Sequence, residues 1–215
     1  MAWSLSPEEV KYKDSCLVLR AMPDYWETNF DERSGFVPCQ TPWGRWWQTV
    51  AEVHVEVDVP PGTRAKFIQV TVKPSHIRAV VLDKVVFEGP LFAVVRADEA
   101  MWTLEDKKTI HLIMTKADAC SKETAWESLL KDDFLVDPWT FHEMRKKLDL
   151  ERFQIENPGF DFSGATLKAG YDKVPDSMIE KWAEKQYAIQ EKEIQAKLEE
   201  TKEEVTDYIK ESSEK

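Results

Sequence analysis

Valines alternate with polar residues between positions 53 and 59, and this period of two is typical of a β-strand with one apolar and one solvated face. Turn-forming residues at positions 60–62 end the strand. The alternation then returns at Ile68, Val70 and Val72 and stops before Pro74. Two successive half-buried strands with a turn between them indicate a sheet that covers a core on one side only.

Four more short apolar segments follow at a spacing of about ten residues, which is typical of antiparallel β-sandwiches. The segments are HIRAVVL at 76–82, KVVFEG at 84–89, MWTLED at 101–106 and TIHLIMT at 109–115. No alternation of strands with helices is visible, so a parallel sheet with crossover helices is not indicated. The sequence therefore predicts a mainly β fold, an antiparallel sandwich of about seven strands with a C-terminal helical extension.

Changes in composition divide the chain into four parts. Residues 1–42 form an irregular extension with at most a short helix near 6–15, and the sandwich domain occupies 43–130. Residues 131–170 form a helical and extended tail that docks on the domain, and a charged helix fills 171–215, opening after Pro175.

Two short helices are expected after the last strand. Apolar residues fall at helical spacing at Trp126, Leu129, Leu130 and Phe134, and again from Phe141 to Phe153. Asp137 and Pro138 must interrupt the path between them. In the following segment NPGFDFSGA, Phe160 and Phe162 are expected to anchor an extended tail on the domain.

The net charge of −11 and the isoelectric point of about 5.0 exclude several partners. Nucleic acid and anionic membranes both require a broad cationic surface. Three widely spaced cysteines argue against a disulfide framework and for a reducing compartment. No signal peptide and no run of about 20 apolar residues occurs, so the predicted location is the cytoplasm.

No constellation of residues predicts catalysis, a cofactor or a metal ion. The histidines at 54, 76, 111 and 142 lack metal-ligand spacing, and His54 and His111 are interpreted as exposed strand residues. Only 7 glycines are present and no phosphate-binding loop is recognisable. We therefore expect a protein without enzymatic activity, and a hydrolase with an unrecognised site is the least favoured class.

Aromatic residues are abundant, with 9 tryptophans and 10 phenylalanines. Large rings anchor protein interfaces because they remove much apolar area from water, but they also fill cores. Trp102 shares strand parity with Leu104, which favours a core position. For Trp46 and Trp47, near the first strand, both interpretations stay open.

The order of these motifs resembles a CS domain of the NudC family. The resemblance spans about residues 31–166, and several of its strings are rare. They are TPWGRWWQT at 41–49, EVHVEVDVPPGTRAKFI at 52–68, GPLF at 89–92, ADEAMWTLED at 97–106, AWESLL at 125–130, DPW at 137–139 and LERFQIENPGFDFSGA at 150–165. Residues 1–30 and those after about 171 have no counterpart in this pattern.

The resemblance implies a p23/Hsp20-like sandwich and a co-chaperone linked to Hsp90. Its clients would include WD-repeat β-propellers of the dynein pathway, in the cytoplasm and in association with the cytoskeleton. The alternative is a stable assembly adaptor in a motor or cytoskeletal complex. On either hypothesis the expected protein-binding residues are Trp46, Trp47, Trp102, Lys107, Lys108, Phe160 and Phe162.

The terminal helix carries a seven-residue repeat, which is the spacing of a coiled-coil seam. The seam residues that are expected to mediate self-association are Tyr187, Ile194, Leu198, Val205 and Tyr208. Glu191 and Thr201 fall on the same seam and weaken it. Homodimerisation through this helix therefore competes with a solvated or partner-bound helix.

Overall fold

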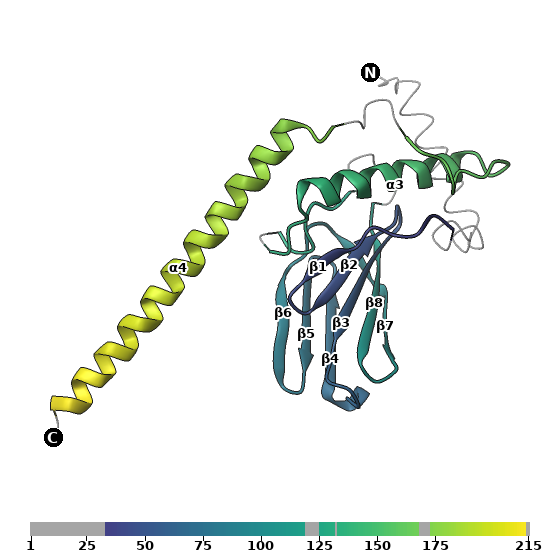
Figure 1. The fold of residues 1–215 in the computed structure, drawn as a ribbon. Coiled ribbons are helices and arrows are strands. Elements are labelled where there is room, and N and C mark those ends of the chain that lie inside the picture. Colours follow the sequence, from purple (N-terminus) through teal and green to yellow (C-terminus); the bar gives the residue numbers. More distant parts are fainter. Residues whose placement is uncertain (1–32, 119–124, 132, 168–172, 214–215) are drawn as a thin grey trace, which may run out of the picture. The chain divides into compact units, whose positions relative to one another are not determined.

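The computed structural model describes residues 33–118, 125–131, 133–167 and 173–213. The short helix expected near 6–15 lies outside these residues. The chain divides into two compact units, Met1–Asp172 and Lys173–Lys215. The first holds the sandwich and a helix, α3, and the second holds the terminal helix, α4 (Figure 1).

Two antiparallel sheets form the sandwich, as predicted, with strand orders β1-β2-β3-β8-β7 and β4-β5-β6 (Figure 1). A short 3₁₀ turn, η2 (Ala65–Phe67), precedes β4. The strands are β1 (Cys39–Thr41), β2 (Gly44–Gln48), β3 (Glu52–Asp58), β4 (Ile68–Lys73), β5 (His76–Val81), β6 (Lys84–Pro90), β7 (Val95–Glu105) and β8 (Thr109–Lys116).

Alternating side chains of β3 and its neighbours form the core between the sheets. Val55 is fully buried, and it lies opposite Trp46 of β2 and Leu112 of β8, which are buried as well. Trp102 of β7 lies opposite Leu112 and is half-buried. The apolar residues that recur with a period of two in the sequence are therefore the ones that face the core.

Strand β1 lies in the part of the chain that the sequence indicated to be irregular. It pairs with β2 across a tight turn that ends at Gly44. Gly44 has a φ of 148°, and a Cβ there would run into the backbone carbonyl of Glu56 on β3. Only glycine allows this close approach, so the turn depends on that residue.

Helix α3 (Pro138–Glu156) follows the sandwich, and the expected helix over 126–134 is wrong, because the described residues 125–131 and 133–136 are not helical. That segment is a loop in which Ser128 forms a bridge with Leu135. A second bridge joins Leu130 to Leu91, directly after β6, and Phe134 has a φ of 58°. Trp126, Leu129 and Leu130 are buried, and the Leu130 side chain lies against Gly89 of β6. The helical spacing of the apolar residues in this loop therefore reflects their burial and not a helix.

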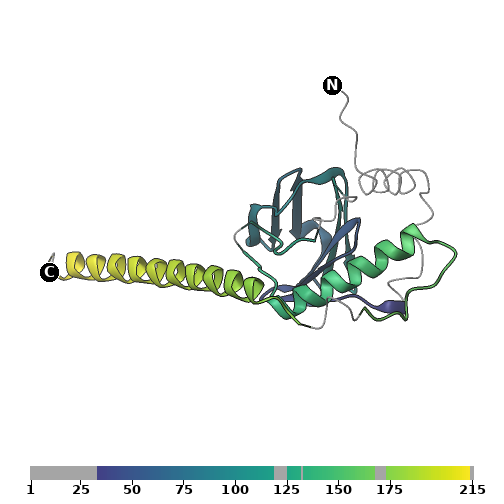
Figure 2. The ribbon, with the colours of Figure 1, turned by 90° about the horizontal axis from the view of Figure 1, so that it is seen from above.

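Helix α3 begins where Asp137 caps it. The Asp137 carboxylate accepts hydrogen bonds from the backbone amides of Trp139 (3.1 Å) and Thr140 (3.0 Å), and Pro138 occupies the first turn. The helix lies across one end of the sandwich, as seen from above in Figure 2. Its buried side chains include Phe141, Met144 and Leu148.

Helix α4 (Asp176–Ser213) has 38 residues and confirms the predicted terminal helix. Tyr187, Ile194 and Leu198 on its seam are 73%, 59% and 53% exposed, and Val205 and Tyr208 lie further along the same helix. Among the helices in the described ranges, none combines the length and apolar character that a bilayer crossing requires.

Candidate protein-binding surfaces

The sandwich has two ends, and α3 covers one of them, which we call the capped end. Val50, Leu148 and Ile155 form an apolar cluster there, with Ala125 packed against it. The Glu151 carboxylate accepts a hydrogen bond of 2.9 Å from the backbone amide of Val50. Both apolar burial and this bond fix α3 on the sheet.

Beneath α3, polar side chains are buried and hydrogen-bonded to one another. The Gln48 side chain donates to the carbonyl of Trp126 and accepts from its amide, both at 2.8 Å. The Lys116 ammonium donates to Gln48 Oε1 at 2.9 Å and to the Thr49 carbonyl at 2.8 Å. Buried polar groups are stable only with such partners, so the network positions the loop after β8.

Burial lowers the pKa of Lys116 from 10.5 to about 7, although the Glu151 carboxylate acts in the opposite direction. The side chain stands at the inward parity of β8, beyond Ile110, Leu112 and Met114. This network was not predicted from the sequence. The signal for it was a lysine that continues an inward-facing apolar series.

The outer face of the larger sheet carries a stack of rings. Phe36 stacks on Trp47 with centroids 4.3 Å apart, and Trp47 stacks on His54 at 5.1 Å and on His111 at 5.6 Å. The two histidine rings lie side by side, with His54 Nδ1 3.3 Å from His111 Nε2. Arg45 stands over both Phe36 and Trp47.

The interpretation of His54 and His111 as exposed residues is therefore wrong. Their side chains are only 13% and 21% exposed because Trp47 and its neighbours cover them. Trp46 is fully buried and Trp47 is 7% exposed. Both tryptophan rings are buried, so their expected part in binding a partner stays a prediction.

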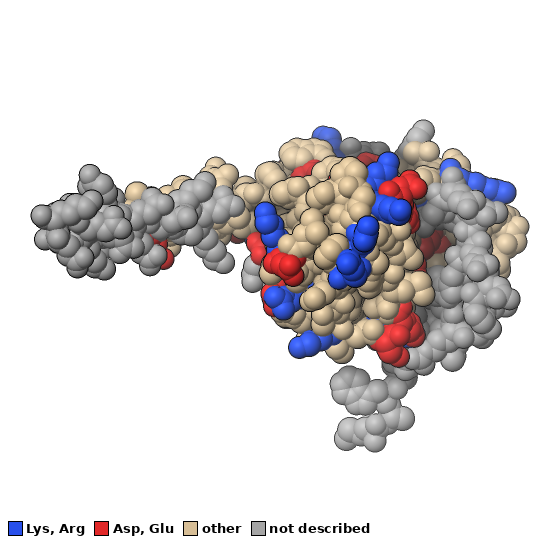
Figure 3. All heavy atoms as spheres, turned by 90° about the horizontal axis from the view of Figure 1, so that it is seen from below, with Lys and Arg blue, Asp and Glu red and all other residues tan. Residues whose placement is uncertain are grey.

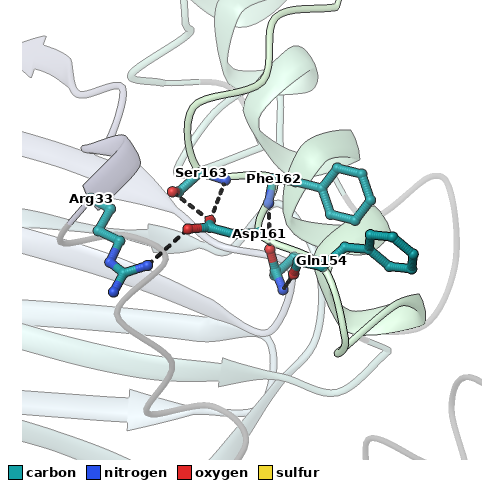
Figure 4. Close-up of polar contacts among 6 residues, drawn as sticks. Arg33, Gln154, Asp161, Phe162 and Ser163 are labelled. Carbon is teal, nitrogen blue, oxygen red and sulfur yellow. Dashed lines mark hydrogen bonds and ion pairs between the residues drawn. The ribbon is translucent and has the colours of Figure 1, made fainter.

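The NPGFDFSGA segment folds back on α3, where Gln154 holds it (Figure 4). Gln154 donates to the Phe160 carbonyl at 2.6 Å and accepts from the Phe162 amide at 2.8 Å. The Phe162 ring lies 6.4 Å from that of Phe153 on α3, whereas Phe160 is 69% exposed. Phe162 thus contacts the helix and Phe160 faces solvent.

Asp161 joins this segment to the start of the described chain. Its carboxylate accepts hydrogen bonds from the Ser163 hydroxyl (2.6 Å) and amide (3.0 Å), and it forms an ion pair of 2.8 Å with Arg33 (Figure 4). These contacts, those from Ser163 first, lower the pKa of Asp161. Lys147 likewise contacts Ser34 and Gly35, so residues 33–35 lie against α3 and the tail.

The end of the sandwich away from α3, which we call the open end, consists of three connections at 59–67, 82–83 and 106–108, together with Lys84 at the start of β6. Backbone hydrogen bonds join them. Val59 donates to the Lys108 carbonyl at 2.8 Å, and Gly62 donates to that of Lys107 at 3.0 Å. The Leu82 amide donates to the Phe67 carbonyl at 2.9 Å. Lys107 and Lys108 therefore belong to one surface with residues distant in sequence.

Figure 3 shows the molecule from the side of the open end, where basic side chains lie among acidic and uncharged ones. The basic residues of the open end are all exposed, and they are Arg64, Lys66, Lys84, Lys107 and Lys108. Phe67 and Leu82 are each 43% exposed. Of these residues, only Lys107 and Lys108 were predicted from the sequence, because the strand order that brings the others close to them cannot be read from the pattern.

In the described part of the chain, no group of three histidine, cysteine or acidic residues has the geometry of a metal site. Cys39 is buried, and burial raises the pKa of its thiol from 9.0 to about 11. Such a thiol is a poor nucleophile at neutral pH.

An antiparallel sandwich capped by a helix, together with a match to the CS domain family over residues 42–116, defines a CS-domain protein. Human NudC domain-containing protein 2 is 50% identical over 146 residues, which cover 67% of this chain and 91% of that protein. The chain therefore belongs to the NudC family.

Two further relatives extend the comparison. The nuclear movement protein nudc of Schizosaccharomyces pombe is 30% identical over 106 residues, covering 48% of this chain and 62% of that protein. The crystal structure of NudC domain-containing protein 2 from Mus musculus shares 49% identity, covers 60% of this chain and 98% of that chain, and gives a TM-score of 0.35.

Proposed function

We propose that the protein is a non-enzymatic co-chaperone that binds and stabilises client proteins. Membership of the NudC family supports a p23-like co-chaperone role in general. The observation that carries the proposal is the exposure of large apolar side chains on a sandwich whose core is already filled. They are Phe67 and Leu82 at the open end, and Trp139, Phe153 and Phe160 on α3 and the tail.

Passive binding explains how such a protein acts without an energy source. Binding the exposed apolar surface of a partly unfolded client lowers the concentration of free client and slows its self-association. A net charge of −11 keeps the resulting complexes dispersed. No nucleotide is needed at any step, in keeping with the expected lack of enzymatic activity.

The partner classes follow the family resemblance: Hsp90, and clients with WD-repeat β-propellers in the dynein pathway, met in the cytoplasm and on the cytoskeleton. Among the residues expected to bind them, Lys107, Lys108 and Phe160 are exposed, and Trp102 and Phe162 are half-buried. Nucleic acid and membranes are not among the proposed partners.

A heated-client assay tests this function. Light scattering of a thermolabile enzyme at about 45 °C is followed with the full chain, with albumin, and with the Phe160→Ser variant. The wild type is expected to suppress scattering at substoichiometric to equal amounts and Phe160→Ser to suppress it less. Protection no better than that of albumin would remove the co-chaperone proposal.

The alternative, a stable assembly adaptor, draws on α4. Its exposed Tyr187, Ile194 and Leu198 would recruit a second copy or one fixed partner. An adaptor copurifies with one complex in constant ratio, whereas a co-chaperone leaves its client, so quantitative mass spectrometry of the isolated complexes separates the two. A mass drop in light scattering after truncation at Gly170 identifies self-association through α4, and equal monomer masses exclude it.

A further inference from the structure

We propose that the open end is a docking surface for an acidic peptide segment that also carries apolar side chains. This inference rests on the proposed protein-binding function and names the chemistry of one partner. It draws on the charge, the apolar exposure and the rigidity of this surface.

The charge of the open end opposes that of the whole chain. Its three connections and Lys84 beside them carry five basic residues and two acidic ones, Asp83 and Asp106, in a chain with a net charge of −11. Two further acidic residues, Asp58 and Glu105, end the strands that lead into these connections. Within the described residues, none of these five cations forms an ion pair. Five arginines elsewhere in the same unit do pair with carboxylates: Arg33, Arg45, Arg78, Arg96 and Arg152. Unpaired cations on a small surface attract an anionic partner.

The exposed apolar residues indicate a partner that carries apolar side chains as well as negative charge. Phe67 is 43% exposed, and the Lys66 ammonium lies 4.8 Å from the centroid of its ring. Leu82 is exposed to the same extent and has a φ of 51°, in a hairpin turn where asparagine or glycine is favoured. A purely anionic ligand would leave both side chains in water, whereas alternating acidic and apolar residues would cover both kinds of group.

The surface is also held in place before any partner arrives. The hydrogen bonds from Val59, Gly62 and Leu82 to the facing connections fix the three backbones relative to one another. Binding to a rigid surface costs less conformational entropy than binding to mobile loops. A short extended segment is therefore sufficient to occupy it.

A peptide fits this surface better than nucleic acid or an anionic membrane does. Both of those present extended negative charge, and their affinity depends on many cationic contacts. Asp83 and Asp106 interrupt the cations here, and the acidic remainder of the chain repels a long polyanion.

Fluorescence anisotropy with the full chain tests the proposal. The probe is a labelled eight-residue peptide of alternating Glu and Leu. Charge reversal in Lys107→Glu/Lys108→Glu or in Arg64→Glu/Lys66→Glu is expected to weaken binding at least tenfold, roughly the cost of losing two charge contacts. The matched control is Lys73→Glu/Lys131→Glu, which makes the same charge change at exposed lysines near the capped end and should alter the Kd by less than about twofold.

A second comparison, between two peptides, tests the contribution of the exposed apolar side chains. Phe67→Ser is expected to weaken binding of the Glu/Leu peptide. It should leave unchanged the affinity for a Glu/Ser peptide, which binds the wild type more weakly. Circular dichroism confirms that each variant is folded. The proposal is overturned if wild type does not bind the Glu/Leu peptide, if the Lys73/Lys131 control weakens binding equally, or if only an oligonucleotide or phosphatidylserine vesicles bind at this surface. Retained protection of a heated client in any of these cases would leave the co-chaperone function standing without this docking surface.

Discussion

The capped end of the sandwich buries Lys116 among hydrogen-bond partners, whereas the open end leaves five basic side chains in water. At the capped end, Gln48 and Glu151 tie together the sheet, the loop after β8 and α3. At the open end, backbone hydrogen bonds fix the connections and the side chains stay free of ion pairs among the described residues.

From this difference we infer that the capped end stabilises the fold and that the open end binds partners. Breaking a buried polar network leaves unsatisfied groups and strongly destabilises a fold, while exposed charges contribute little to stability. Changes at the capped end should therefore alter the free energy of unfolding. Changes at the open end should alter association and leave the fold intact.

The largest expected effect is that of Gln48→Ala. It removes an acceptor from the buried Lys116 ammonium and both backbone partners of Trp126. We expect a loss of about 3 kcal/mol in the free energy of unfolding, measured by urea denaturation. Gln69→Ala, an exposed position on β4, is the control and should cost less than about 0.5 kcal/mol. Equal losses would mean that the network is not the support of the capped end.

The pH dependence of stability comes next. Because the folded pKa of Lys116 is lowered to about 7, the unfolded chain binds more protons between pH 7 and 10.5, so stability should rise with pH. The slope from this group is at most about 1.4 kcal/mol per pH unit. Lys116→Met should flatten the rise between pH 7 and 9 in urea titrations.

That window avoids the opposing effect of Cys39. Its thiol has a raised folded pKa of about 11, so from pH 9 upwards the unfolded chain loses this proton first and stability falls. An unchanged slope in Lys116→Met between pH 7 and 9 would contradict the assignment of the rise to Lys116.

A smaller effect is expected at the tail. Phe162→Ala removes a half-buried ring that packs near Phe153, and it should cost about 1 kcal/mol and expose the tail to limited proteolysis after residue 157. Phe160→Ala is the matched control, since that ring is 69% exposed, and it should leave the cleavage rate unchanged. Identical cleavage of the two variants would show that Phe162 does not hold the tail.

The smallest effect on stability is that of Lys107→Ala/Lys108→Ala. Both side chains are exposed, so the free energy of unfolding should change by less than about 0.5 kcal/mol. The same variant should lose affinity for the Glu/Leu peptide. A loss of stability as large as that of Gln48→Ala would contradict the inference that the open end binds partners without stabilising the fold.

The sequence predicted the strands well because a half-buried strand shows its burial as a period of two. It failed at Trp126, Leu129 and Leu130, because a loop pressed onto a sheet buries residues at the same spacing as a helix does. Strand β1 is too short to show any alternation.

The binding surfaces were less predictable than the fold. Trp46 and Trp47 fit either a core or an interface by composition. In the structure Trp46 lies opposite Val55 and is buried in the core, whereas Phe36 and His54 cover Trp47 on the outer face. The open end gathers Arg64 and Lys107 from two connections and Lys84 from the start of β6. Nothing local in the sequence places those connections side by side, because that depends on the strand order of both sheets.

Hydrogen-exchange mass spectrometry of the full chain, with and without a thermally destabilised client, tests most directly whether the open end binds while the capped end stabilises. The account predicts added protection at 59–67, 82–84 and 106–108 and around the exposed Phe160, with exchange beneath α3 unchanged. The Lys73→Glu/Lys131→Glu variant should give the same footprint and Lys107→Glu/Lys108→Glu should lose it. Protection confined to α3 and residues 157–165, with the open end unaffected, would contradict it.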